Sequence, residues 1–141
     1  MKKLLITLVI LIQGFLAFSQ NSGLRLSLSS DVTGQSLSSL TLNPSLQYFI
    51  KDWLAVGGTY YHNNADDFTI NYFDANVRTY VATNCFAQAG LSSDLEDRTG
   101  LNLSIGYTAF INRLFIEPGF KYTHFDNSDR IAMFIGVGLK L

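Results

Sequence analysis

Two histidines near acidic residues are the first candidates for chemistry in this 141-residue sequence. His62 lies shortly before Asp66 and Asp67, and His124 lies shortly before Asp126. Imidazole nitrogens and carboxylate oxygens together form zinc sites, in which a protein supplies three or four ligands. Each histidine here borders a polar segment and stands alone, so we expect two solvated side chains and no metal site.

The segment around His124 also offers the residue types of nucleophilic catalysis. A serine attacks a carbonyl when a histidine takes its proton and an acidic residue orients that histidine. Ser128 follows His124 in a polar segment, where nothing supports the geometry that a base needs. Cys85 is the single cysteine, which excludes an intramolecular disulfide, and we expect it to pack rather than to react. These residues predict no catalytic centre.

The elements that must position any such residues are β-strands. From Arg130 to Leu141, apolar residues occupy every odd position while mostly small or polar residues occupy the even ones, which is the period of a strand with two different faces. Gly100–Ile111 and Leu114–His124 repeat this pattern. Five further strands are predicted, the last two from weaker alternation: Gly23–Ser30, Ser38–Ile50, Leu54–His62, Phe68–Val81 and Cys85–Ser93.

Tight turns and longer polar loops alternate between these eight strands. The two-residue turn Asn112-Arg113 predicts a hairpin with Phe110 opposite Phe115 and Gly106 opposite Gly119. Successive hairpins bring all the longer loops to one end of the sheet, which we expect to be acidic. The longer loops are predicted to contain Asp31, Asp66, Asp67, Asp94, Glu96, Asp97, Asp126 and Asp129.

Strand length and composition indicate which solvent surrounds the sheet. Charged residues make up only 15% of the chain, against about 25% in ordinary soluble domains. Several predicted strands are longer than the roughly 5–6 residues typical of globular sheets and long enough to cross a bilayer. The aliphatic face suits lipid, and the other face, which mixes charge, glycine and phenylalanine, suits the packed interior of a small barrel. The sequence predicts an all-β fold, an eight-stranded antiparallel up-and-down transmembrane β-barrel. The alternative is a soluble, secreted, lipocalin-like carrier whose strands face the other way.

A network of charges is expected inside the barrel. Unpaired charges in a narrow interior are unfavourable, so Asp74 and Glu117 should each find an Arg or Lys partner on another strand. Arg78 is the expected partner of Glu117, because Lys121 lies about 13 Å further along the same strand at roughly 3.3 Å per residue. The predicted inward charges are Arg25, Asp74, Arg78, Glu117, Lys121, Arg130 and Lys140.

Two prolines fall inside predicted strands. Pro44 and Pro118 both lie on the outward face. Proline has no N–H to donate to the ladder, so we expect a local bulge or kink at each.

The first nineteen residues are typical of a secretory signal peptide. Lys2 and Lys3 precede the apolar run Leu4–Phe18, and Ala17 and Ser19 are small residues at the positions of a cleavage site. The run is shorter than the roughly 20 residues that a membrane-spanning helix needs. We expect residues 1–19 to be removed and residues 20–141 to form one barrel domain.

Short motifs resemble a known family. Phe86–Leu91 and Phe115–Phe120 share the pattern F-x-[QE]-x-G followed by an apolar residue. Asn43–Ile50 is followed, after a turn, by Leu54–Gly58. Together these segments resemble the small outer-membrane barrels of the OmpX-like group, the outer membrane protein beta-barrel domain, in which a P-S-x-x-Y-F strand, a short turn and an L-A-x-G-x strand recur.

The end of the chain extends this resemblance. Gly136, Leu139 and Leu141 resemble the signal that the barrel-assembly machinery reads, with leucine in place of the usual final phenylalanine. The resemblance implies a monomer in the outer membrane of a Gram-negative cell envelope, in contact with lipid and lipopolysaccharide, with both termini in the periplasm.

The predicted function is a structural or surface role without catalysis. An eight-stranded interior is filled by side chains and should conduct little. No cofactor is expected, and there is no basic patch for nucleic acid. Some outer-membrane barrels of this size modify lipid A with a histidine, a serine and an acidic residue, so a lipid A-modifying enzyme is the other alternative, although the spacing of Ser128 departs from that pattern. The acidic loops are a further candidate, for binding calcium or magnesium.

Overall fold

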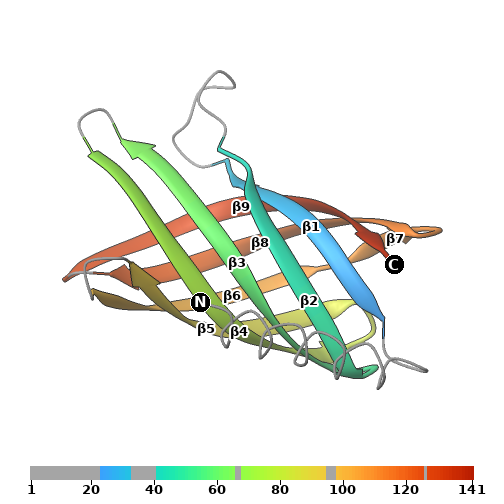
Figure 1. The fold of residues 1–141 in the computed structure, drawn as a ribbon. Helices are drawn as coiled ribbons and strands as arrows, with labels where there is room; N and C mark the ends of the chain where they lie inside the picture. Colours follow the sequence, from blue (N-terminus) through green and yellow to red (C-terminus); the bar gives the residue numbers. More distant parts are fainter. Residues whose placement is uncertain (1–22, 33–40, 66–67, 95–97, 126) are drawn as a thin grey trace, which may run out of the picture.

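The chain forms a closed antiparallel β-barrel, as predicted (Figure 1). The computed structural model describes residues 23–32, 41–65, 68–94, 98–125 and 127–141. Each strand pairs with its neighbour in sequence, apart from β6 and β7, which both pair with β8, and the pairing of β1 with β9 completes the ring. The strands are β1 Leu24–Asp31, β2 Asn43–Lys51, β3 Leu54–Ala65, β4 Phe68–Ala82, β5 Cys85–Asp94, β6 Thr99–Tyr107, β7 Ala109–Ile111, β8 Leu114–Phe125 and β9 Ser128–Lys140.

Strands β6 and β7 act as one strand of the wall that is interrupted at Thr108. Both pair with β8 in the same register, so the predicted partners of Phe110 and Gly106 on β8 are confirmed. The ladder to β8 lacks the pairs of Tyr107 and Thr108, and Tyr107 would face Pro118, which offers no N–H there. The barrel is therefore eight-stranded although nine segments are regular.

The bulge expected at Pro44 is absent. Pro44 pairs in register with Leu28 of β1, and the ladder between β2 and β3 begins only at Ser45. Pro44 is the second residue of its strand, before the ladder to β3 begins, and so interrupts no ladder on that side. The expected strand start at Ser38 is also too early, since Thr41 and Leu42 precede β2. Register shifts occur beside two tight turns, between Phe49 and Lys51 and between Tyr80 and Ala82.

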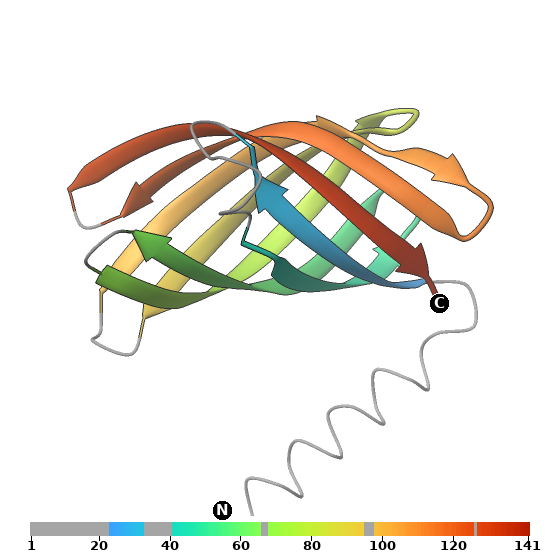
Figure 2. The same cartoon turned by 90° about the horizontal axis from the view of Figure 1, so that it is seen from above.

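The two ends of the barrel differ. Tight turns join β2 to β3, β4 to β5 and β7 to β8 at one end, which we call the short-turn end, and the last strand also ends there (Figures 1 and 2). The other connections lie at the opposite, long-loop end. Asn84 and Asn112 adopt positive φ angles of 67° and 61° in two of these turns, a conformation that asparagine accepts more readily than most residues.

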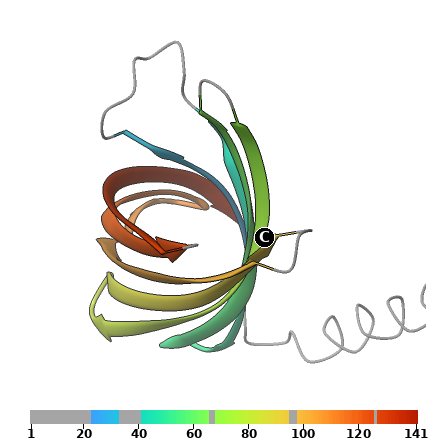
Figure 3. The same cartoon turned by 90° about the vertical axis from the view of Figure 1, so that its left-hand side faces the viewer.

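The strands wrap around a central interior (Figure 3). Among the described residues, fifteen buried residues are polar or charged and only six are hydrophobic. In contrast, 27 large hydrophobic side chains are exposed on the outside and at the ends. The barrel is therefore polar inside and apolar outside, the reverse of a water-soluble core. Within the same residues, no helix has the length and apolar character needed to span a membrane.

Candidate functional site

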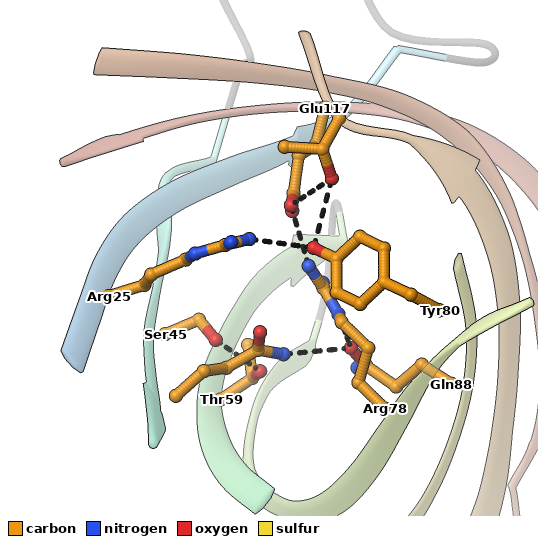
Figure 4. A network of polar contacts seen from close by, with 9 residues as sticks. Arg25, Ser45, Thr59, Arg78, Tyr80, Gln88 and Glu117 are labelled. Atoms are coloured by element: carbon orange, nitrogen blue, oxygen red, sulfur yellow. Dashed lines mark hydrogen bonds and ion pairs between the residues drawn. The ribbon is translucent and has the colours of Figure 1, made fainter. Parts of the chain in front are cut away.

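An ion pair crosses the middle of the barrel interior. Arg78 of β4 places Nη1 2.6 Å from Oε1 of Glu117 on β8, and both side chains are at most 8% exposed (Figure 4). This is the pair expected from the sequence. Thr108 Oγ1 donates a second hydrogen bond to Glu117 Oε1 at 2.8 Å, and Arg78 Nε donates to Oε1 of Gln88 at 2.9 Å. The two buried charges therefore satisfy each other and have neutral partners on both sides, which offsets their loss of water.

Arg25 joins this network through a tyrosine. Its Nη1 donates to the Tyr80 hydroxyl at 2.7 Å, and that hydroxyl lies 3.1 Å from Thr108 Oγ1 (Figure 4). Since Thr108 donates its own proton to Glu117, Tyr80 donates to Thr108. The Arg25 guanidinium also lies 4.0 Å from the centre of the Phe49 ring and 4.8 Å from that of Phe110. Aromatic rings stabilise this cation by cation–π attraction. Arg25 therefore reaches Glu117 through two hydroxyl groups.

Asp74 was expected to pair with an Arg or Lys, and this expectation is wrong. Its carboxylate is fully buried and accepts hydrogen bonds from Asn76 Nδ2 at 2.8 Å, Asn102 Nδ2 at 2.7 Å and Ser92 Oγ at 3.3 Å. No Lys or Arg of the described chain forms an ion pair with it. Three neutral donors on β4, β5 and β6 stabilise the negative charge instead, because hydrogen bonds to an ionised carboxylate are strong.

Gly90 makes room for the Asp74 carboxylate. A Cβ added at Gly90 would lie 2.3 Å and 2.5 Å from the two carboxylate oxygens. We expect Gly90→Ala to displace Asp74 from its donors and lower the free energy of unfolding by about 1–3 kcal/mol. Gly136→Ala is the matched control, because a Cβ there meets no atom closer than 3.5 Å. Denaturant unfolding of both variants checks this, and equal stability of the two would contradict it.

A second ion pair lies nearer the long-loop end. Lys121 of β8 places Nζ 2.9 Å from Oδ1 of Asp31, and Arg130 Nη2 lies 3.8 Å from Asp31 Oδ2. Asp31 was expected in an acidic loop, and that placement is wrong. It is the last residue of β1 and its side chain is buried in the interior. The strand ends one residue later than predicted, and this brings Asp31 into the interior beside Lys121.

Stacked aromatic rings that the sequence analysis missed lie beside this pair. Tyr61 and Tyr72 have ring centres 4.7 Å apart, and the ring centres of Tyr72 and Phe125 are 5.4 Å apart. Lys121 Nζ lies 4.3 Å from the centre of the Tyr61 ring. Tyr61 and Phe125 occupy inward positions of their alternating strands, which is the signal that could have found them. Together these residues fill the interior toward the long-loop end.

Little space remains between the two ion pairs. A cavity of about 30 Å³ lies between them and is lined by Arg78, Glu117, Asp31 and Lys121 together with hydroxyl side chains. That volume holds one or two water molecules. The hydroxyl groups belong to Ser27, Ser29, Ser45, Thr59, Tyr61 and Ser104. The arrangement is suited to rigid packing and to buried water, and it offers no room for an organic substrate.

The histidines lie on the wall and not in the interior. His124 Nδ1 is 2.6 Å from Asp129 Oδ1, which also accepts a hydrogen bond from the Tyr122 hydroxyl at 2.8 Å. Asp129 is the second residue of β9, and its side chain is exposed. Ser128 pairs with Phe125 while His124 pairs with Asp129, so strand alternation puts Ser128 and His124 on opposite faces of the wall.

The remaining candidates lie at the edges of the barrel. His62 Nδ1 contacts Asn71 Oδ1. Cys85 is free and partly exposed beside the short-turn end. Lys140 is exposed at the mouth of that end, and Leu139 and Leu141 are exposed beside it. Gly136 lines the interior cavity.

Much of the expected acidic end lies outside the described residues. This applies to Asp66, Asp67, Glu96, Asp97 and Asp126, and also to the signal peptide. Asp94, which was expected in a loop, ends β5 and pairs with Arg98 at 2.7 Å. In the part of the chain that the structure describes, no three His, Cys, Asp or Glu side chains gather into a possible metal site.

The fold and interior define the class of this protein as a small closed β-barrel with a polar, tightly filled inside.

Comparison with known proteins identifies solved structures with a similar fold. No family model matches the sequence, and no curated protein matches it. The N-terminal β-barrel domain of Pseudomonas aeruginosa OprF is a similar solved structure, with a TM-score of 0.63 and 14% sequence identity over 86% of this chain and 98% of that one. A de novo designed transmembrane β-barrel reaches a TM-score of 0.62 at 15% identity over 84% of this chain and 95% of that one. At such low identity the likeness shows the fold.

Proposed function

We propose that this protein is an integral β-barrel of the bacterial outer membrane with a structural or surface role and no enzymatic activity. The observation that carries the proposal is the inside-out distribution of its side chains. Outward residues such as Ile105, Ile131 and Val137 are 61%, 72% and 51% exposed, while Asp74 and Glu117 are buried. Lipid accommodates such an exterior, whereas water does not. Closure of the sheet also satisfies the backbone hydrogen bonds that hydrocarbon cannot.

The packed interior supports a role other than transport. Two ion pairs, the hydrogen bonds to Asp74 and the stacked aromatic rings occupy the space that a porin would leave open to water. An eight-stranded barrel is just wide enough for its side chains to fill. We expect the barrel to pass neither ions nor solutes at a measurable rate.

Other features of the chain support export and assembly. Residues 1–19 have the composition of a signal peptide, and Gly136, Leu139 and Leu141 resemble the signal that the barrel-assembly machinery reads. The short motifs favour the OmpX-like group within the small outer-membrane barrels. Lipid and lipopolysaccharide are then the immediate partners of a monomer.

Fractionation of cells that express the full chain tests the proposal. We expect the protein in the outer membrane, extractable only with detergent, and migrating differently on a gel with and without boiling because the folded barrel resists unfolding. Recovery from the periplasm without detergent would overturn the proposal. A soluble, lipocalin-like carrier would then be the better interpretation, although the filled interior leaves such a carrier no room for a ligand.

A further inference from the structure

An open groove of about 600 Å³ lies on the outside of the barrel wall, across β4, β5, β6, β8 and β9. Small side chains of β5, those of Ala87 and Ala89, line its middle. Ala89 pairs with Val77 on one side and with Leu103 on the other, and all three side chains are exposed on the outward face. The larger neighbours therefore stand above the two alanines and leave an apolar hollow between them.

A polar cluster lies on the same outward face, nearer the long-loop end. Tyr122 lines the groove, and its hydroxyl donates to Oδ1 of Asp129 at 2.8 Å. His124 Nδ1 lies 2.6 Å from the same oxygen. Both partners use Oδ1, so Oδ2 of the 66% exposed Asp129 side chain has no hydrogen-bond partner within the described residues. The neighbouring cation, Arg130, points inward and approaches Asp31 instead.

The tilt of the strands places the groove below this cluster, in the direction of the short-turn end. One row of paired residues crosses the wall from β8 to β4 as Tyr122, Leu103, Ala89 and Val77. Tyr122 lies near the long-loop end of β8, whereas Val77 lies in the half of β4 that leads to the short turn. The row therefore descends as it crosses the wall, as rows do in barrels with tilted strands. A chain that extends from Asp129 parallel to the barrel axis enters the groove.

We propose that this surface binds a lipid with a primary ammonium headgroup, which donates to Asp129 while one acyl chain fills the groove over Ala87 and Ala89. The proposal rests on the membrane location proposed above. An ammonium group carries a positive charge and three N–H donors, which match an open carboxylate oxygen. The groove faces hydrocarbon in a bilayer, so its occupant must be apolar. A second barrel would present a convex wall, which covers a groove without filling it.

Native mass spectrometry of the folded barrel, released from detergent micelles, tests the headgroup. Phosphatidylethanolamine and phosphatidylcholine with the same acyl chains are added in turn, and bound lipids are counted. Both lipids carry the same phosphate, and only phosphatidylethanolamine has N–H donors on its ammonium. We expect the wild type to bind phosphatidylethanolamine about tenfold more tightly and Asp129→Asn to bind the two lipids alike. An Asp129→Asn variant that keeps the preference would overturn the proposal.

A second set of variants tests the groove. Ala87→Leu, Ala89→Leu fills the hollow and should weaken binding of both lipids by about tenfold or more, while the preference for phosphatidylethanolamine remains. Ala75→Leu is the matched control, because it adds the same side chain on the outward face of β4 outside the groove. It should bind both lipids as the wild type does. Unchanged binding in the filled variant, or an equal loss in the control, contradicts the proposal.

The outcomes separate the lipid site from the membrane location. Variants that are folded by gel mobility and bind as the wild type does would remove the lipid site and leave the membrane location standing. Recovery of the protein without detergent would overturn both. Should the variants fail to fold, the wild type alone decides. Replacement of the N–H donors of phosphatidylethanolamine by methyl groups, one at a time, must then lower the affinity stepwise, and equal affinity across the series contradicts the proposal.

Discussion

Replacement of Glu117 by alanine is expected to lower the free energy of unfolding of the barrel by about 3–5 kcal/mol. The change leaves the Arg78 guanidinium buried beside an empty space and removes the acceptor of Thr108. A buried charge that loses its partner bears most of the cost of leaving bulk water. Reversible denaturant unfolding in detergent or vesicles, followed by the change in fluorescence of Trp53, measures the effect.

A double variant without either charge separates the ion pair from its surroundings. The double variant Arg78→Met, Glu117→Leu removes both charges, and we expect it to regain most of the stability lost in Glu117→Ala, because apolar side chains of similar volume can replace a buried pair. Asp129→Asn is the control, since Asp129 also has a hydrogen-bonded partner, His124, but its side chain is 66% exposed. Salt screens an exposed pair, so this variant should match the wild type. A Glu117→Ala variant as stable as the control would contradict the buried network.

Replacement of the outward residue Ile135 by arginine is expected to destabilise the barrel by about 2–4 kcal/mol when it is folded in a bilayer. Ile135 lies near the middle of β9, is 45% exposed and belongs to the apolar exterior. In a bilayer its position is deep in hydrocarbon, where a guanidinium loses its water. On a wall that faced water, the same change would alter stability by less than about 0.5 kcal/mol, as surface substitutions usually do.

Ile131→Arg provides the depth control for this experiment. Ile131 lies on the same face of β9, near the long-loop end, and is 72% exposed. An arginine there can extend to the interface, so we expect a loss of only about 0–1 kcal/mol. Folding equilibria in vesicles of the two variants give the comparison. Equal effects at the two depths would argue against a bilayer around this wall.

The strands and their facing follow from local sequence because a period of two is visible in consecutive residues. The alternation over Arg130–Leu141 is enough to place Ile131, Ile135 and Val137 outside. The hairpin around Asn112 is predictable as well, since a two-residue turn leaves one register that keeps like faces together. The bulge expected at Pro44 shows the limit of such reasoning. A proline interrupts a ladder only where its N–H would have donated a hydrogen bond to a neighbouring strand.

Whether two side chains meet across the interior depends on more than whether each of them points inward. Arg78 could be chosen from the sequence as the partner of Glu117 because Lys121, on the same strand, lies too far along it. The partner predicted for Asp74 was of the wrong kind, because the prediction considered only side chains of opposite charge. The donors are the neutral amides of Asn76 and Asn102.

The sequence by itself thus determined that this chain is a barrel of eight alternating strands, which face they turn outward and how its tightest hairpin pairs. Only the tertiary structure decided that Asp31 meets Lys121 and that Gly90 lies beneath Asp74. The physical reason is that two inward side chains meet only at the same height in the closed barrel. The position of a side chain along the barrel axis depends on the register of every strand pair between it and its partner. This register belongs to the whole closed sheet and cannot be inferred from one segment of sequence.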